Sequence, residues 1–458
     1  MKRASCVRQV LSRTQSRLAG RAGFRSSGAS FLTALFLFIL VHVAWAADAV
    51  SNDKGTFLSW HYTLGFDERF RVEEKRDFDF NKAVKDDGNL FFNRFRLHLN
   101  ASLTDEYLNK LAEVFIEGMD AQTGGYRIKA TAGQADEFDL HQAYLNIVNL
   151  AGSDFSFKAG RQELKYGTGR LISAPVWANI IRTFDAGVLR YAHNGFTDDI
   201  FYARNVKTIP HAFDNFYADE ALSGTYFGYQ KYAVAPLFEG YYLSLVNTQA
   251  KNNLQRYTVG ARLKAMLPLG ATIDIEVPYQ FGNDAGKQVR AYAFHADVSK
   301  SFESLMWRPK ISLSYDLASG DKKATDNANN TFIPLYQSTH EPYGIMDFFR
   351  WENMRNPELS MTFYPTEKFR FTPQVDLFWL DSVNDAWYNS SGTVVRKQTT
   401  GNRSLYVGSE ASLRFYYDFS KNICWETGGA HFFSGAYVRD TGPANNTNWV
   451  YTQIILKY

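Results

Sequence analysis

Two segments of this chain concentrate side chains that could bind an anion. The guanidinium group of arginine presents a planar fork of donors that matches a carboxylate, and it stays charged at any relevant pH. A tryptophan side chain adds a flat face for a sugar ring. The first segment, residues 160–185, carries Arg161, Arg170, Trp177, Arg182 and Asp185, and the second, residues 347–353, carries Arg350.

The same residue types have a second interpretation, because ion pairs that brace a loop use arginines and acids as well. Arg182 with Asp185 is one such pair that the spacing allows. The sequence alone leaves an anion site and a braced loop equally open.

A further set of arginines lies on segments in which apolar and polar residues alternate. If the apolar face meets lipid, these arginines face a polar interior together with several acids. For any single member, a structural ion pair is the simpler interpretation. The arginines are Arg69, Arg94, Arg96, Arg262, Arg370 and Arg414.

Motifs of soluble enzymes are missing from the sequence. There is no G-x-S-x-G, H-E-x-x-H or Walker loop, and residues 339–342 (Thr-His-Glu-Pro) lack the second histidine of a metalloprotease motif. We therefore predict no catalytic residue, no metal and no cofactor. An outer-membrane hydrolase with a site scattered over several strands stays an alternative.

The alternation itself predicts half-buried strands. In residues 95–103, for example, Phe95, Leu97 and Leu99 form one face, and Arg96 and His98 belong to the other. Many of these segments run ten or more residues, about the length that a tilted strand needs to cross a bilayer. Aromatic residues lie near segment ends, such as 60–62, 241–242 and 432–433, which suits interfacial girdles.

Connections between the predicted strands alternate between short turns and long loops. This alternation is typical of transmembrane barrels and is not expected in a soluble β-sandwich. We predict an all-β, antiparallel, up-and-down barrel of about 18 strands (16–20), with long extracellular loops and short periplasmic turns. The predicted strands are 57–73, 91–103, 110–119, 138–147, 154–165, 186–193, 199–207, 224–232, 238–247, 256–265, 271–281, 289–299, 310–319, 357–364, 369–381, 405–418, 422–438 and 449–458.

Residues 1–46 form a predicted cleaved signal peptide, which leaves 47–458 as a single barrel domain. Seven basic residues and no acid precede the apolar run 31–43, which is too short to span about 30 Å of hydrocarbon as a helix, and Ala44-Trp45-Ala46 resembles a cleavage site. Without this segment, 43 basic residues face 47 acids, so charge gives no reason to expect a nucleic-acid partner. The mature chain keeps one cysteine, Cys424, and has no internal disulfide.

The chain resembles the alginate-export family of outer-membrane barrels. The resemblance lies in Gly160-Arg161-Gln162 with Leu164, in Arg170-Leu171, Trp177 and Arg182-Thr183-Phe184-Asp185, in Ser319-Gly320-Asp321 and in Phe349-Arg350. It implies an 18-stranded monomer with an arginine-lined, anion-selective constriction that exports a polyuronate, and it places Arg161 and Arg350 at that constriction. The chain departs from the family in the fourth strand, where residues 141–146 (His-Gln-Ala-Tyr-Leu-Asn) replace an arginine followed by acidic and aromatic residues.

From these features we expect a passive channel for acidic polysaccharide or small anionic solutes in the bacterial outer membrane. The expected partners are outer-membrane lipid, lipopolysaccharide, the barrel-assembly machinery, which reads a terminal strand such as 449–458, and periplasmic secretion components. An uptake porin for small organic acids or sugars is the nearest alternative. A plugged structural or adhesive barrel belongs to a different class.

Overall fold

The computed structural model describes residues 58–84, 87–126, 134–249, 253–323, 325–338, 340–397 and 404–458. The predicted signal peptide lies outside the described residues. No helix among the described residues is long and apolar enough to cross a membrane.

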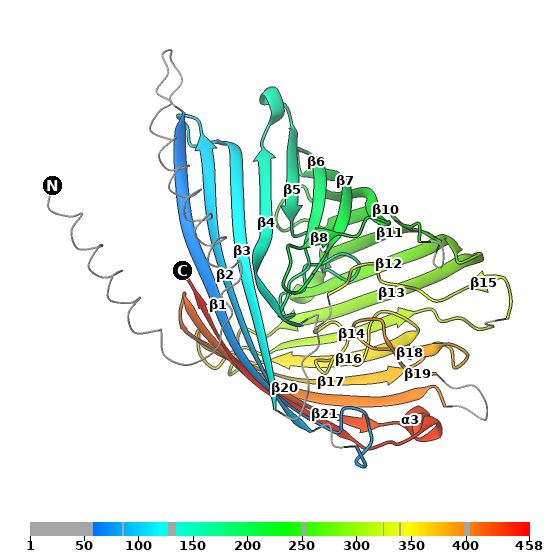
Figure 1. Cartoon of the computed structure of the whole chain (residues 1–458). Helices are drawn as coiled ribbons and strands as arrows, with labels where there is room; N and C mark the ends of the chain where they lie inside the picture. The colour runs from blue at the N-terminus through cyan, green and yellow to red at the C-terminus, as the bar shows by residue number, and fades with distance from the viewer. Residues whose placement is uncertain are drawn as a thin grey trace. The chain divides into compact units, whose positions relative to one another are not determined.

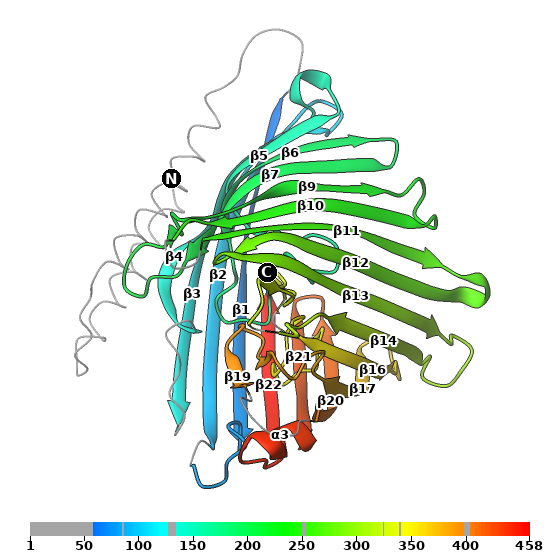
Figure 2. The same ribbon diagram turned by 90° about the vertical axis from the view of Figure 1, so that its right-hand side faces the viewer.

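Eighteen long strands form one closed antiparallel barrel (Figures 1 and 2), which confirms the predicted fold. Each strand pairs with the next along the chain, and β1 closes the ring by pairing with β22. The long strands are β1 (Ser59–Arg76), β2 (Gly88–Thr104), β3 (Lys110–Tyr126), β4 (Asp136–Ile147), β5 (Phe155–Gln162), β6 (Phe184–His193), β7 (Phe196–Lys207), β9 (Glu220–Tyr229), β10 (Leu237–Asn247), β11 (Leu254–Met266), β12 (Ala271–Asp284), β13 (Lys287–Ser301), β14 (Lys310–Ala318), β16 (Met354–Thr362), β17 (Phe369–Trp379), β20 (Tyr406–Ser420), β21 (Ile423–Ser434) and β22 (Thr447–Lys457).

Smaller elements lie in the loops and turns. They are the strands β8 (Asn215–Phe216), β15 (Ala328–Asn329), β18 (Ala386–Tyr388) and β19 (Val394–Lys397), the 3-10 turns η2 (Leu150–Gly152) and η3 (Pro268–Gly270), and the helix α3 (Ala436–Thr441). The predicted strand 422–438 is therefore too long: β21 ends at Ser434, and α3 follows Gly435, which has a Val407 carbonyl within 2.6 Å of the position of a Cβ atom.

Apolar and polar faces alternate in the barrel as the sequence predicts. On β1, Leu64, Phe66 and Phe70 are exposed on the outside, whereas Arg69 and Arg71 are buried on the inside. Adjacent aromatic residues consequently divide between the two faces. Phe433 is exposed on the outside and Phe432 is fully buried inside, so only one member of such a pair can belong to a girdle.

Both ends of the barrel chain lie on the side of the short turns, since Ser59 at the start of β1 pairs with Thr104 beside one short turn, and the Lys457 N–H at the end of β22 donates to the Asn422 carbonyl in another. We call this the short-turn end and the opposite one the long-loop end. Short turns at the first end are 105–109, 194–195 and 421–422, and long loops at the other include 163–183 and 319–353.

Two of the long loops fold into the barrel and meet there. Backbone hydrogen bonds join them: the Tyr336 N–H donates to the Leu171 carbonyl (2.7 Å) and the Ser173 N–H to the Tyr336 carbonyl (2.8 Å). We call residues 163–183, 330–338 and 340–353 the lumen septum.

An apolar core holds the lumen septum in place. Trp351, Ile345 and Phe349 from the long loop are buried, and Phe349 stacks on the lumen-facing Phe378 of β17 with the ring centroids 3.9 Å apart. Phe432 of β21 belongs to the same cluster. Because inward-facing strand residues and loop residues share this core, packed protein narrows the lumen at the long-loop end.

Candidate functional site: a cationic chamber in the lumen

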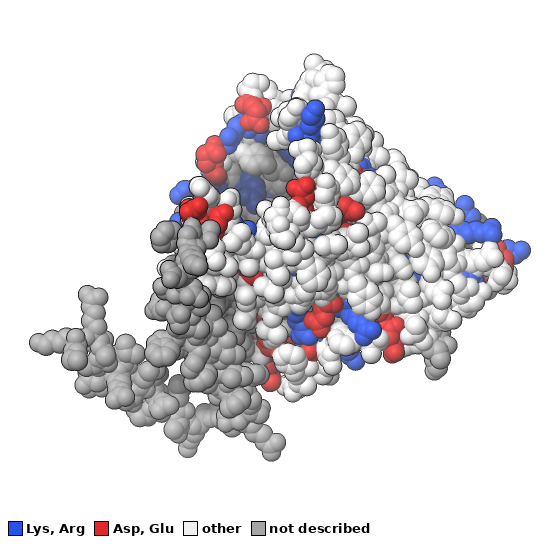
Figure 3. Space-filling model, turned by 90° about the horizontal axis from the view of Figure 1, so that it is seen from above, with Lys and Arg blue, Asp and Glu red and all other residues white. Residues whose placement is uncertain are grey.

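A cavity of about 580 Å³ lies in the lumen between the septum and the short-turn end. Figure 3 shows the barrel hollowed on the face that it presents, with Lys and Arg side chains visible inside the hollow. We call the cavity the cationic chamber, because six basic side chains line it against three acidic ones. The basic residues are Arg69, Arg94, Arg96, Lys165, Arg370 and Lys457, and the acidic residues are Asp67, Glu341 and Glu426.

Arg69 and Arg94 lie directly opposite each other on β1 and β2. Opposed like charges destabilise a strand pair. Neither guanidinium group forms an ion pair with any described acid, and both are bound instead by the septum: Arg69 donates to the carbonyls of residues 176–178 and to Asn179 Oδ1 at 2.9 to 3.1 Å, and Arg94 to the carbonyls of Val176 and Ala178 at 2.9 Å.

These hydrogen bonds orient the two guanidinium groups without neutralising them, because a carbonyl carries no net charge. The Nε atoms of Arg69 and Arg94 are buried and have no hydrogen-bond partner among the described residues. The pair therefore places at the chamber wall two positive charges that form no direct ion pair with a described acid.

Two further basic residues of the chamber, Arg96 and Arg370, are partly compensated by acids. Arg96 donates a short hydrogen bond to Asp67, which lies opposite it on β1. Arg370, on β17, has a side chain that is 37% exposed and lies 3.5 Å from Asp418. Its guanidinium carbon lies 4.1 Å from the centre of the Tyr416 ring.

Trp177 lines the chamber, as the sequence led us to expect of a site residue, but other side chains of the protein pack on its ring. The indole stacks on the His340 ring with the centroids 3.9 Å apart, and the Arg71 guanidinium lies 4.0 Å from its centre. The open face that a sugar ring would need is occupied by these contacts in this structure.

Arg161 and Arg350, which the family resemblance placed at the constriction, do not line the chamber. Arg161 makes a two-bond pair with Asp185 (2.8 and 3.2 Å) in the barrel wall. Arg350 lies 3.0 Å from Glu352 and donates to the Pro334 carbonyl inside the septum. That either of them lines the pore stays a prediction.

The bracing pair expected between Arg182 and Asp185 is wrong, since Asp185 pairs with Arg161. Arg182 instead donates to three septum carbonyls, those of Ser173, Tyr336 and Gln337, at 2.9 to 3.2 Å. Burial lowers the pKa of Arg182 to about 10, so the side chain remains charged at neutral pH.

The other predicted arginines do not line the chamber, and each pairs with an acid. Arg170 lies 3.3 Å from Asp316, and Arg262 donates to Asp274 at 2.5 and 2.7 Å. Arg414 forms a short contact with Glu341. The sequence analysis did not select Lys165, which lies three residues after the end of β5, or Lys457, the last residue of β22, whose inward face the alternation of that strand could have indicated.

Closed barrel, alternating faces and a charged lumen together define the class: an outer-membrane, porin-like β-barrel channel. The family model described as "Alginate export" matches residues 61–452. The chain therefore belongs to the alginate-export family, and it is a bacterial outer-membrane barrel of a family of channels, not of enzymes. The search of curated proteins returned no match.

Solved structures share the barrel at low identity. Pseudomonas aeruginosa OccK2 (OpdF) is 11% identical, with a TM-score of 0.57, over 87% of this chain and 97% of that one. P. aeruginosa OccK3 (OpdO) is 12% identical, with a TM-score of 0.55, over 87% and 95% of the two chains. Acinetobacter baumannii OccAB1 is 11% identical, with a TM-score of 0.55, over 87% and 96%. These likenesses concern the fold.

Proposed function

We propose that this channel passes anions, that its cationic chamber selects them, and that an acidic polysaccharide of the alginate class, exported from the short-turn end, is its cargo. The observation that carries the proposal is the opposed pair Arg69 and Arg94, neither of which forms an ion pair with a described acid. Residues that break a local rule of strand pairing without local compensation are expected at functional sites.

The physical action of the pair is electrostatic. A carboxylate that leaves bulk water for the chamber loses hydration, and fixed guanidinium groups in a narrow, poorly screened space offset that loss and repel cations. Nothing in this action requires a catalytic step, and we assign the chain none.

The cargo class comes from the family description and from the charge of the chamber. A polyuronate carries one carboxylate on each sugar, so successive carboxylates can exchange along a row of basic residues. Arg96, Lys165 and Arg370 extend the row beyond the central pair. Small organic acids satisfy the same electrostatic requirement, so the cargo test uses chain length as a variable.

Ion selectivity in planar bilayers tests the central claim. We expect the reversal potential under a KCl gradient to show anion preference in the wild-type channel and to lose most of it in the double variant Arg69→Gln/Arg94→Gln. The control is Arg76→Gln, which removes one positive charge from an exposed pair with Glu74 outside the chamber. A reversal potential that the double variant leaves unchanged would refute the role of the pair.

Block of the current tests the cargo class. Oligouronates added at the short-turn end should reduce the current more strongly with increasing chain length, and neutral oligosaccharides of equal length should not. The double variant should lose this length dependence. Equal block by a single uronic acid and by long oligouronates would favour a small-acid channel instead.

A further inference from the structure

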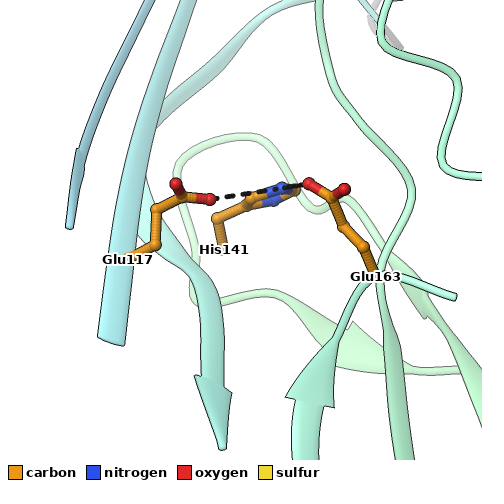
Figure 4. Close-up of side chains that lie close together, drawn as sticks. All are labelled: Glu117, His141 and Glu163. Carbon is orange, nitrogen blue, oxygen red and sulfur yellow. Dashed lines mark hydrogen bonds and ion pairs between the residues drawn. The ribbon is translucent and has the colours of Figure 1, made fainter. Parts of the chain in front are cut away.

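Three side chains in the wall beside the chamber place metal-binding atoms close together. They are Glu117 of β3, His141 of β4 and Glu163, which follows β5. His141 Nε2 lies 3.1 Å from Glu163 Oε1 and 3.8 Å from Glu117 Oε1, and all three atoms lie within 4.8 Å of one another. Figure 4 shows the imidazole between the two carboxylates.

A local irregularity of the sheet creates this arrangement. Glu117 pairs with Gln142, but the next residue, Gly118, pairs with Leu140, so His141 is an extra residue in β4. Such a bulge bends the strand locally and re-aims a side chain. It lets His141 join Glu117 on the lumen side, where regular alternation would send one of the residues 141 and 142 outwards.

Gln142 holds both glutamates in place through hydrogen bonds. Gln142 donates to Glu117 Oε1 at 3.1 Å and accepts a hydrogen bond from the Glu163 N–H at 3.1 Å. The side chains of Glu117 and His141 are 4% and 3% exposed, whereas that of Glu163 is 27% exposed. The group is thus rigid on its wall side and accessible from the lumen.

From this geometry we infer that Glu117, His141 and Glu163 form a binding site for a divalent transition metal of the Zn²⁺ class in the lumen wall. Bonds of about 2.1 Å to nitrogen and oxygen separate the ligands of a tetrahedral ion by about 3.4 Å. The separations of 3.1 and 3.8 Å bracket that value. One imidazole and two carboxylates match the ligands that Zn²⁺ takes, and a solvent ligand from the lumen completes the shell.

Arg96 is the competitor for the same carboxylates. Its Nη1 atom lies 3.7 Å from Glu117 Oε1 and 3.6 Å from Glu163 Oε1, but among the described residues its hydrogen bond goes to Asp67. Its charge opposes a bound cation and limits the affinity. Removal of that charge should therefore strengthen metal binding, which an ion-pair network alone would not predict.

Isothermal titration of the refolded full barrel with ZnCl₂ in detergent tests the site. We expect one site in the wild type, binding at least about tenfold weaker in His141→Ala and in the isosteric Glu163→Gln, and binding about tenfold stronger in Arg96→Gln. His431→Ala, which removes an exposed histidine bonded to Asn448, is the matched control and should leave the titration unchanged.

Two further readouts complete the test. Binding of Zn²⁺ adds two positive charges beside the chamber, so the reversal potential should shift towards greater anion preference in the wild type and not in His141→Ala. Co²⁺ in place of Zn²⁺ should give a visible absorption band that Glu163→Gln alters. Absence of Zn²⁺ binding to the wild type, or binding that neither His141→Ala nor Glu163→Gln weakens, would overturn the inference, and neither result bears on the selectivity of Arg69 and Arg94.

Discussion

Two arginines of the cationic chamber and two of the lumen septum have different kinds of partner. In the septum and the adjoining wall, Arg350 and Arg170 each lie within 3.3 Å of an acid, and the charges cancel. In the chamber, Arg69 and Arg94 bind carbonyl groups, and their charges persist. The role of an arginine in this barrel therefore depends on its partner. An acid neutralises its charge in a structural ion pair, whereas a carbonyl orients the guanidinium group and leaves its positive charge in place.

The two regions also depend on each other. The carbonyls that orient Arg69 and Arg94 belong to residues 176–178 of the septum. A septum that loosens should therefore release the chamber arginines as well as open the lumen. The following predictions separate the two consequences.

Removal of the central septum side chain should have the largest effect. Trp351 is fully buried and packs edge-on against Phe332 at 5.3 Å. Trp351→Ala should cost about 3–5 kcal/mol, and we expect a larger and noisier single-channel conductance together with a lower urea midpoint. Val176→Ala, an exposed septum position, is the control. A wild-type conductance in Trp351→Ala would contradict the view that apolar packing narrows this end of the lumen.

The pH should modulate the septum through Glu352. Burial raises the pKa of Glu352 from 4.5 to about 7, Arg350 partly opposes the shift, and Asp385 adds to it. The folded state then binds more protons than the unfolded state between these two pH values, so septum stability should fall by about 3 kcal/mol as the pH rises from about 4.5 to about 7 and should be constant above.

Denaturation of the refolded barrel at pH 4.5, 6 and 8 measures this dependence. Glu352→Gln should flatten it, because the amide stays neutral throughout. A slope that survives in Glu352→Gln would assign the pH dependence to another group.

A more local change concerns the attachment of the septum to the wall. Glu410 of β20 accepts the Ile345 N–H at 2.6 Å and the Met346 N–H at 3.3 Å. Glu410→Gln leaves one oxygen for two hydrogen bonds that use both carboxyl oxygens, and such a bond contributes about 0.5–1.5 kcal/mol, so the variant should accelerate amide exchange at Ile345 and Met346. Glu426→Gln, whose partners are Tyr451 and Gln453, should leave that exchange unaltered.

Much of the barrel could be predicted from the sequence because lipid on one side and water on the other impose a period of two. The strand number and the inward face of Arg69, Arg94 and Arg96 follow from that period alone. The septum could not be predicted in this way, since its contacts join residues far apart: Arg69 meets the Trp177 carbonyl 108 positions away.

The site residues show the same limit at finer scale. Arg69 and Arg161 look alike in the sequence, and only the fold reveals that one meets carbonyls and the other Asp185. The bulge at His141 is invisible as well, because a single extra residue changes the pairing register without changing the pattern that predicts a strand. The partner of a side chain and the pairing register of a strand depend on the tertiary structure. The alternation of apolar and polar residues therefore cannot predict them.

The smallest expected effect is at the rim of the chamber. Arg370 is 37% exposed and lies 3.5 Å from Asp418, an arrangement that contributes about 0–1 kcal/mol to stability. Arg370→Gln should therefore leave the urea midpoint almost unchanged and reduce anion preference only slightly at 0.1 M salt. At 1 M salt, where charges are screened over about 3 Å, the reduction should vanish, whereas the buried pair Arg69 and Arg94 should keep part of its influence. Equal salt sensitivity of Arg370→Gln and of Arg69→Gln/Arg94→Gln would mean that the pair is as well solvated as the rim, and that its lack of acidic partners gives it no special role in selectivity.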